Sequence, residues 1–287
     1  MERREPATAA AIEALKHYPG DVITEISPND GMHTDDVSED PTVAYFEHGR
    51  AAIDAIRLVL LAAQKETIGQ ILDLPSGYGR VMRFLKAEYP GAVLTACDVI
   101  REGVDFCAAT FGARPLYGRE DPAELSTEER FDLIWCGSLL THVDAPAWSA
   151  FLDFFESVLA PGGVLVFTTN GRSAAAHLRD PELGEQLLMD PARGKLLRGY
   201  SKKDFGYADY LVDPEFRASM SMAERYGLSL AGPSWVCSLI EARPRLQLLT
   251  YMENRWSTQD VVGCMAVEGV SLAQSPLEIP YVRGAET

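Results

Sequence analysis

The residues best suited to chemistry surround a turn that contains two glycines. A mostly apolar run at 70–74 includes Asp73 and leads into Pro-Ser-Gly-Tyr-Gly at 75–79. Glycines let a backbone approach a ligand closely and adopt positive φ, and a helix that follows such a turn presents unpaired N–H groups to a polar ligand. A second acidic residue, Asp98, ends the next apolar run and could accept hydrogen bonds from a ribose diol. The pattern predicts a site for a nucleoside-containing ligand.

The glycine spacing bears on which ligand the turn would hold. A loop that binds the pyrophosphate of a dinucleotide usually reads G-x-G-x-x-G directly after the strand, and this turn lacks the third glycine. An acidic strand end also suits a cationic ammonium better than a diphosphate. A nicotinamide-dependent oxidoreductase is therefore the weaker enzyme hypothesis, and a tight turn without any ligand stays open.

Apolar runs alternate with helical patterns through the first two thirds of the chain. Such alternation predicts an α/β fold with a doubly wound, mostly parallel sheet covered on both faces, for which we expect seven strands. Ligands of these sheets lie beyond the carboxyl ends of the strands. We expect strands at 70–74, 92–98, 114–117, 131–136 and 164–168, helices at 41–64, 81–88, 103–110 and 147–159, and a sharp turn at 160–163.

The remaining segments divide the chain further. Residues 1–40 form an N-terminal extension with a short helical stretch at 6–16, and 41–270 form the main domain. Within that domain, 171–213 is too long for a simple loop, so it should carry its own helices and cover a site. A hairpin of 247–253 and 261–267 joined by a polar turn at 254–260 should close the domain, before an irregular tail at 271–287.

Composition narrows the classes of partner. The net charge of −16 argues against nucleic-acid binding, which draws most of its affinity from Lys and Arg. Five scattered cysteines include no C-x-x-C pair, so we expect no metal site and no disulfide framework. No apolar run approaches the length of a membrane span, and no signal core opens the chain, so the expectation is a cytoplasmic protein without membrane contact. The oligomeric state is not determined by the sequence.

Several segments together resemble the class I S-adenosylmethionine (SAM)-dependent methyltransferases over about residues 45–169. Ile-Leu-Asp-Leu-Pro-Ser-Gly-Tyr-Gly-Arg at 71–80 resembles the first motif of the family, and Thr-Ala-Cys-Asp at 95–98 the second. The segments at 131–142 and 159–166 resemble its fourth strand and its turn into strand five. Pro75 replaces the usual first glycine, as in a bacterial subgroup with Asp-Leu-Pro-x-Gly-x-Gly that is often associated with glycosyltransferases. Segments 205–210, 226–227 and 256–260 extend this likeness less specifically.

The resemblance implies SAM as the cofactor and assigns residues to its parts. The methionine and ribose moieties would contact Asp73, Ser76, Gly77 and Gly79, with Pro75 in the same loop lacking a backbone N–H. Asp98 would bind the ribose hydroxyls, Val99 would pack on the adenine, and Glu120 or Asp121 would face the adenine amine. Two further groups complete the cofactor site: Cys136, Gly137 and Ser138 beneath the sulfonium, and Tyr45 and Gly49 at the carboxylate end.

Methyl transfer needs alignment of donor and acceptor, and a base where the acceptor must lose a proton. His142 follows the fourth strand and is the candidate catalytic base and acceptor contact, because its ordinary pKa suits neutral pH. The alternative is a loop histidine that caps backbone groups. Asp144 either orients His142 or, as the favoured reading, caps the following helix.

The acceptor is expected to be a small molecule that carries a hydroxyl or an amine, with a saccharide or glycan intermediate as one class. Tyr207, Asp209, Gln259 and an exposed Trp256 are candidate acceptor contacts, although core packing is the favoured interpretation for an aromatic such as Tyr207, and the residues around Trp256 could simply form the turn. A third hypothesis is a non-catalytic interaction module with the SAM-binding fold, motivated by Pro75 and by the absence of a certain base.

Overall fold

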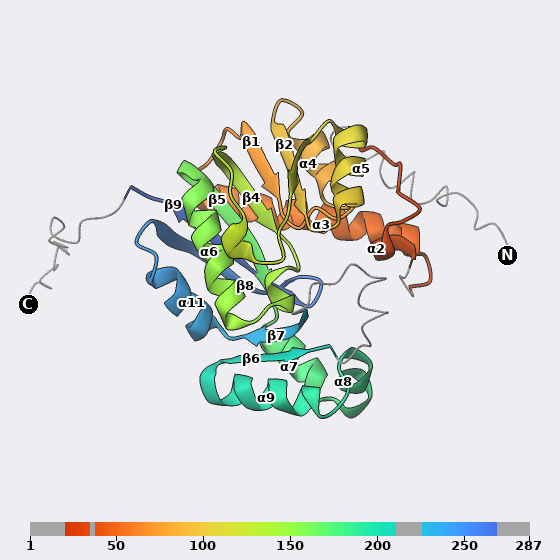
Figure 1. The fold of residues 1–287 in the computed structure, drawn as a ribbon, viewed down its shortest axis with the longest axis vertical. Helices are drawn as coiled ribbons and strands as arrows, with labels where there is room; N and C mark the ends of the chain where they lie inside the picture. Colours follow the sequence, from red (N-terminus) through yellow and green to blue (C-terminus); the bar gives the residue numbers. More distant parts are fainter. Residues whose placement is uncertain (1–20, 35–37, 211–225, 269–287) are drawn as a thin grey trace, which may run out of the picture.

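The chain folds around one twisted sheet, shown in Figure 1. The computed structural model describes residues 21–34, 38–210 and 226–268. Seven strands lie in the order β3-β2-β1-β4-β5-β9-β8, with β1 to β5 parallel and β9 antiparallel to both β5 and β8. The predicted fold class is confirmed. The strands are β1 (Gln70–Asp73), β2 (Val93–Asp98), β3 (Arg114–Tyr117), β4 (Phe131–Cys136), β5 (Leu159–Thr169), β8 (Leu246–Trp256) and β9 (Gln259–Ala266).

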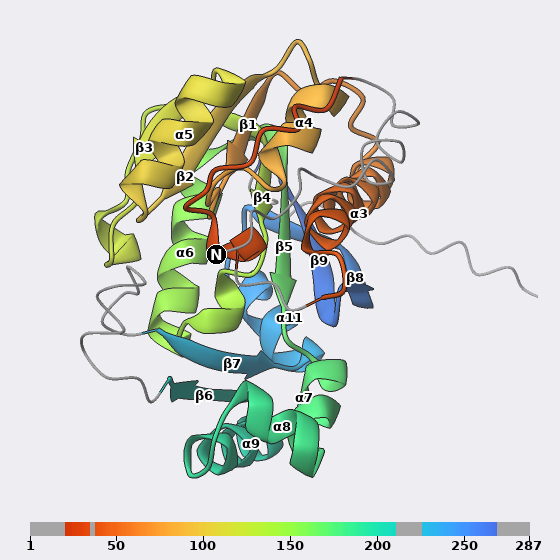
Figure 2. The same cartoon turned by 90° about the vertical axis from the view of Figure 1, so that its right-hand side faces the viewer.

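Helices cover both faces of the sheet, as Figure 2 shows. Side chains of α3 (Pro41–Ala62), α4 (Met82–Glu88) and α5 (Arg101–Phe111) share one buried cluster with Ile71, whereas α6 (Ala145–Val158) and α11 (Pro233–Glu241) share another with Leu72. Successive strand residues point to opposite faces. Because both faces are buried, the strands read as continuous apolar runs rather than as alternating ones.

Helices α3 and α6 begin at aspartates that act as N-caps. The side chain of Asp40 accepts hydrogen bonds from the N–H groups of Thr42 and Val43, both at 3.1 Å, and Asp144 accepts one from Ala147 N at 3.1 Å. Each aspartate thereby satisfies donors that a helix start leaves unpaired. The capping interpretation of Asp144 is confirmed.

The sharp turn expected at 160–163 lies inside strand β5 rather than before it. Strand β5 begins at Leu159, which pairs with Phe131, and the register then shifts before Leu133 pairs with Val164. Gly162 lies within this irregularity with φ of +68°. The turn-forming residues therefore produce a bulge inside a longer strand, because the strand pairing begins before them.

The segment after β5 forms a small unit of its own, below the sheet in Figures 1 and 2. It has its own buried apolar cluster, which includes Leu178, Leu196 and Leu230. The expectation that it carries helices is confirmed. Its elements are α7 (Arg172–Arg179), α8 (Pro181–Leu187), α9 (Ala192–Lys203) and the antiparallel pair β6 (Phe205–Asp209) and β7 (Gly227–Ala231).

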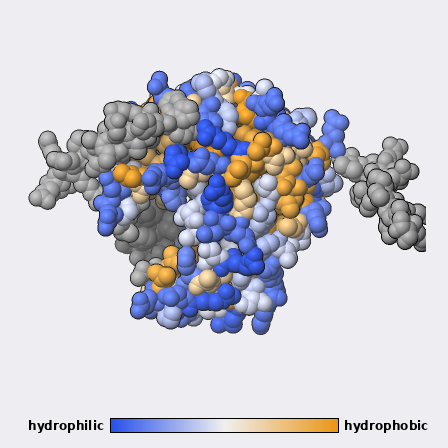
Figure 3. All heavy atoms as spheres, turned by 180° about the vertical axis from the view of Figure 1, so that it is seen from behind, coloured by the Kyte–Doolittle hydropathy of each residue, from blue (hydrophilic) through white to orange (hydrophobic). Residues whose placement is uncertain are grey.

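Some expectations fall outside the described residues. These are the helical stretch at 6–16, the end of the insertion at 211–213 and the tail at 271–287. Among the described residues, no helix has the length and apolarity that crossing a membrane would need. The face seen in Figure 3 mixes hydrophilic and hydrophobic side chains.

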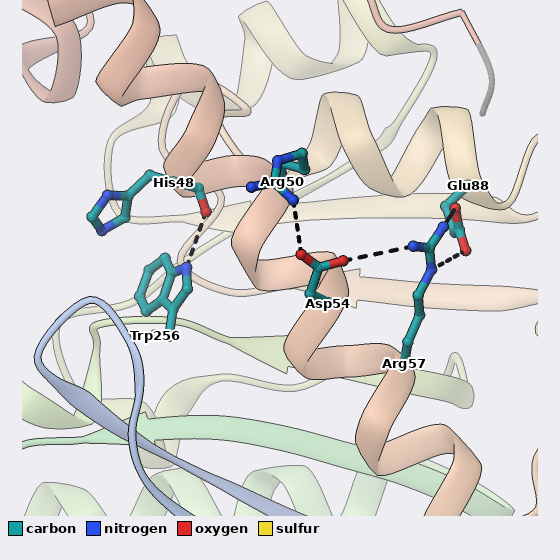
Figure 4. A network of polar contacts seen from close by, with 6 residues as sticks. All are labelled: His48, Arg50, Asp54, Arg57, Glu88 and Trp256. Carbon is teal, nitrogen blue, oxygen red and sulfur yellow. Dashed lines mark hydrogen bonds and ion pairs between the residues drawn. The ribbon is translucent and has the colours of Figure 1, made fainter. Parts of the chain in front are cut away.

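Helix α3 is fixed against α4 at two places. Arg57 on α3 forms two hydrogen bonds to the Glu88 carboxylate, at 2.7 and 2.6 Å, and Figure 4 shows this pair beside Asp54. Nearer the start of α3, Gly49 lies so close to α4 that a Cβ atom would collide with the Arg80 carbonyl and the Phe84 ring. The short distance between these helices therefore depends on the glycine.

We predict that Gly49→Ala lowers the free energy of unfolding by about 1–3 kcal/mol, as overpacking of a close contact does. Denaturant unfolding measures this change. The matched control is Gly91→Ala, since a Cβ atom at Gly91 would meet nothing within 4 Å. Equal stability of the two variants would contradict the packing role of Gly49.

Candidate functional site

The glycine turn lies at the carboxyl ends of β1 and β2. Ser76 N donates to the Cys97 carbonyl at 2.9 Å, and Gly79 N donates to the Ser76 carbonyl at 2.9 Å. Gly77 and Gly79 have φ values of +50° and +81°, a region that favours glycine. The Leu74–Pro75 peptide bond is cis. The two glycines thus let the chain leave β1 and reverse into α4.

Asp98 holds this turn from the neighbouring strand. One carboxylate oxygen, Oδ2, accepts a hydrogen bond from Gly77 N at 2.8 Å, and the other, Oδ1, accepts one from Ile100 N at 2.9 Å. Burial raises the pKa of Asp98, and hydrogen bonds from backbone N–H groups oppose this rise. A carboxylate can accept about four hydrogen bonds. Asp98 therefore retains capacity for a diol while it fixes the loop.

Asp73 is buried without hydrogen bonds. It is 1% exposed, and among the described residues neither carboxylate oxygen has a partner, nor does the hydroxyl of the buried Ser76. Burial raises the pKa of Asp73 well above its usual range, the negative charge of Asp98 raises it further, and the positive charge of Arg80 opposes both. Unpaired buried polar groups are costly. A bound ammonium group would relieve this cost, so the residues fit the amino end of SAM.

The loop is packed on one side and open on the other. A Cβ atom at Gly79 would collide with the Phe111 ring, and one at Gly103 would lie 2.5 Å from the Gly77 carbonyl. In contrast, a Cβ atom at Gly77 would meet nothing within 4 Å. Gly77 therefore borders open space.

The segment after β4 joins a ring of polar side chains. Cys136 is buried, Gly137 follows it, and Ser138 has a positive φ of +59°. Ser138 N donates to Thr168 Oγ1 at 2.7 Å, Thr168 Oγ1 donates to Gln259 Oε1 at 2.6 Å, and Gln259 Nε2 donates to Ser138 Oγ at 3.0 Å. Two residues that the sequence assigned to different ligands, Ser138 and Gln259, are therefore in direct contact.

His142 packs beside the end of β6 and the start of β7. Its Nδ1 lies 2.9 Å from the Gly227 carbonyl and 3.3 Å from the Tyr210 hydroxyl, and its ring stacks on Tyr226 at 4.7 Å. Burial lowers the pKa of His142, which favours the neutral ring. Because a carbonyl only accepts, we assign the proton to Nδ1 and leave Nε2 as an acceptor. Nδ1 thus contacts a backbone carbonyl, as expected for a loop histidine that caps backbone groups.

Three predicted site residues have structural contacts instead. Trp256 was expected to be exposed, which is wrong: it is 2% exposed, its ring meets Trp135 edge-on at 5.3 Å, and its Nε1 donates to the His48 carbonyl at 3.0 Å (Figure 4). The buried hydroxyl of Tyr45 donates to Asp30 Oδ2 at 2.6 Å. Gly49, as described above, allows α3 and α4 to approach.

Other predicted residues lie near the surface. Val99 directly follows Asp98 and is 43% exposed. Glu120 and Asp121 are exposed, and Asp121 accepts a hydrogen bond from Ala123 N at 2.9 Å at the start of a short 3-10 helix, Pro122–Glu124. Tyr207 donates to Asp209 Oδ1 at 2.8 Å on β6.

Sequence reasoning missed Arg83 and Tyr226. Arg83 lies in the otherwise apolar run 81–85, and such a placement is a usable signal for a buried, hydrogen-bonded cation. Tyr226 is far from His142 in the sequence, and no local pattern indicates that the two rings stack. No group of three His, Cys, Asp or Glu side chains that could hold a metal ion occurs within the described ranges.

Comparisons with known proteins agree with this geometry. Residues 71–163 match the family model described as a methyltransferase domain. An S-adenosylmethionine-dependent methyltransferase from Clostridium acetobutylicum ATCC 824 aligns with a TM-score of 0.52 at 15% identity, covering 83% of this chain and 96% of the other. A protein from Pyrococcus horikoshii OT3 aligns with a TM-score of 0.51 at 16% identity, covering 89% and 99%.

No curated protein matches the chain. At these identities the solved structures establish the fold alone. Residues 71–163 therefore match a methyltransferase domain, and the seven-stranded sheet that contains them has the fold of these solved structures.

Proposed function

We propose that the chain transfers a methyl group from SAM to a hydroxyl or amine of a small molecule. The observation that carries this proposal is the buried, unpaired Asp73 carboxylate beside a glycine loop that Asp98 fixes. Bound SAM supplies a methyl carbon activated by a positively charged sulfur. The protein then has to hold the cofactor, orient the acceptor and remove a proton from it, which its own residues can do.

In this proposal, each part of the cofactor has its own contacts. Asp73 and Ser76 bind the amino end, and Gly77 and Gly79 allow close approach of the backbone, with Pro75 in the same loop. Asp98 binds the ribose hydroxyls, Val99 packs on the adenine, and Glu120 or Asp121 faces the adenine amine. Cys136, Gly137 and Ser138 lie beneath the methyl donor. Tyr45 and Gly49 support the carboxylate end through packing, since the Tyr45 hydroxyl is bonded to Asp30 and Gly49 lies against α4.

We further propose that His142 acts as the base. Its Nδ1 is anchored on the Gly227 carbonyl, which orients the ring and leaves Nε2 to accept a proton from the acceptor. The lowered pKa keeps the ring neutral, and therefore able to accept that proton, at neutral pH.

The acceptor site is proposed between this histidine and the insertion at 171–213, within a domain that spans 41–270. Gln259, Tyr207 and Asp209 present amide, hydroxyl and carboxylate groups suited to a polyhydroxylated acceptor, and a saccharide is the class that we propose. The Asp-Leu-Pro-x-Gly-x-Gly motif supports membership of the bacterial subgroup associated with glycosyltransferases.

We predict that S-adenosylhomocysteine (SAH), the product form of the cofactor, raises the melting temperature, whereas NAD(P) does not. A ligand at 100 times its Kd stabilises a protein by about 2.7 kcal/mol. Stabilisation by NAD(P) alone would favour the oxidoreductase. Tight SAH binding without turnover on any acceptor would favour a non-catalytic module.

SAH affinity should rise with pH through the raised pKa of Asp73. Because the pKa of Asp73 is raised, its carboxyl group stays protonated at pH values where an ordinary aspartate is ionised. That proton must leave before a cation can bind, so SAH affinity is low below the pKa of Asp73 and reaches a plateau above it. Isothermal titration calorimetry at several pH values measures this. Asp73→Asn should weaken binding about 10-fold or more and flatten the pH dependence; an unchanged profile would exclude Asp73 as the ammonium contact.

His142→Ala should lower turnover by about 10²–10⁴-fold while SAH affinity stays nearly unchanged. Because His142 also holds β7, His142→Asn serves as the companion variant, with an amide able to donate to the Gly227 carbonyl. Steady-state assays with an identified acceptor measure both variants. Full turnover in the Asn variant would assign His142 a purely structural role.

A further inference from the structure

Arg83 on α4 is a completely buried cation, with 0% of its surface exposed. The guanidinium lies 5.2–5.4 Å from the centres of three aromatic rings, those of Tyr45, Phe46 and Phe111. Lysine and arginine are rarely buried fully unless their donors are paired. The partners of Arg83 therefore indicate what its burial achieves.

These partners come from three separate parts of the chain. Nε donates to the Gly79 carbonyl at 3.2 Å, and Nη2 donates to the Tyr45 hydroxyl at 3.3 Å. Nη1 donates to the carbonyls of Ile23 and Glu25, at 2.7 and 2.9 Å. One side chain thus joins the glycine loop, helix α3 and residues 22–30 that precede it.

The contact with Gly79 bears directly on the loop. Gly79 has a positive φ, and its carbonyl accepts from both the backbone N–H of Arg83, at 3.2 Å, and the guanidinium. The orientation of this peptide group determines how the loop turns between Gly77 and α4. A shift of Arg83 would therefore be felt within two residues of the open side at Gly77.

Residues 22–30 also make apolar and polar contacts of their own. Val22, Ile23 and Ile26 pack, partly buried, against the main apolar cluster, and Asp30 accepts the Tyr45 hydroxyl. The Arg83 bonds to the two carbonyls are the shortest polar contacts that Arg83 makes. The docking of this segment and the shape of the loop consequently depend on the same guanidinium.

We propose that Arg83 is a positioning residue that couples the docking of residues 22–30 to cofactor binding at the glycine loop. The coupling rests on the proposed function, because it assigns SAM to that loop. The segment before the expected start of the domain is then part of the binding unit. Lysine cannot replace arginine here, since an ammonium has no planar fork to serve acceptors in several directions.

The experiment combines SAH titration with amide hydrogen exchange on the full chain. Arg83→Lys should weaken SAH binding about 10-fold and accelerate exchange in residues 22–26. Because coupling is reciprocal, SAH should slow exchange in 22–26 of the wild type and should no longer do so in Arg83→Lys. A merely structural arginine would not produce this loss of SAH-dependent protection.

Two further variants keep the outcome decisive. Arg57→Lys, which alters an exposed pair between α3 and α4 away from the loop, should leave affinity and protection unchanged. Ile23→Ser removes the apolar side chain that helps to dock the segment but keeps the backbone carbonyl that Arg83 contacts, so it should weaken SAH binding even where Arg83→Lys fails to fold. Wild-type affinity in Ile23→Ser, or wild-type protection in a folded Arg83→Lys, would overturn the coupling. Absence of SAH binding by the wild type would instead refute the proposed function.

Discussion

The hydrogen bond from the Gly77 N–H to the Asp98 carboxylate is the contact on which the site depends. It joins Asp98, at the end of β2, to the turn that follows Asp73 at the end of β1, and Gly77 in this turn borders open space. Two carboxylates are thereby buried near each other, and only one of them has hydrogen-bond partners within the described residues. A positively charged group bound beside them would therefore stabilise their ionised forms.

The sequence predicts the elements that local pattern governs. The strand at 131–136 has the expected bounds, because a mostly apolar run flanked by polar residues defines it locally, and the strand at 114–117 has them as well. The loop is equally predictable, since its glycines need positive φ. Trp256 was misjudged because its burial depends on Trp135 and on the His48 carbonyl, which are far away in the sequence.

Contacts between distant segments account for the other differences in the site. Tyr45 and Gly49 were assigned to the cofactor by position, yet their side-chain environment is set by Asp30 and by α4, which periodicity does not relate to them. The contacts of Arg83 also join distant segments. Its position in the apolar run 81–85 indicates burial, but it does not indicate the carbonyls to which the guanidinium donates. The ring of Ser138, Thr168 and Gln259 likewise forms only when β9 returns beside β5.

A crystal structure of the complex with SAH would show whether Asp73 and Asp98 bind the cofactor. The account predicts that the amino group of SAH lies within hydrogen-bond distance of Asp73 and that the ribose hydroxyls lie on Asp98, with the Gly77 contact retained. SAH bound elsewhere, or an Asp73 carboxylate still without a partner in the complex, would contradict it.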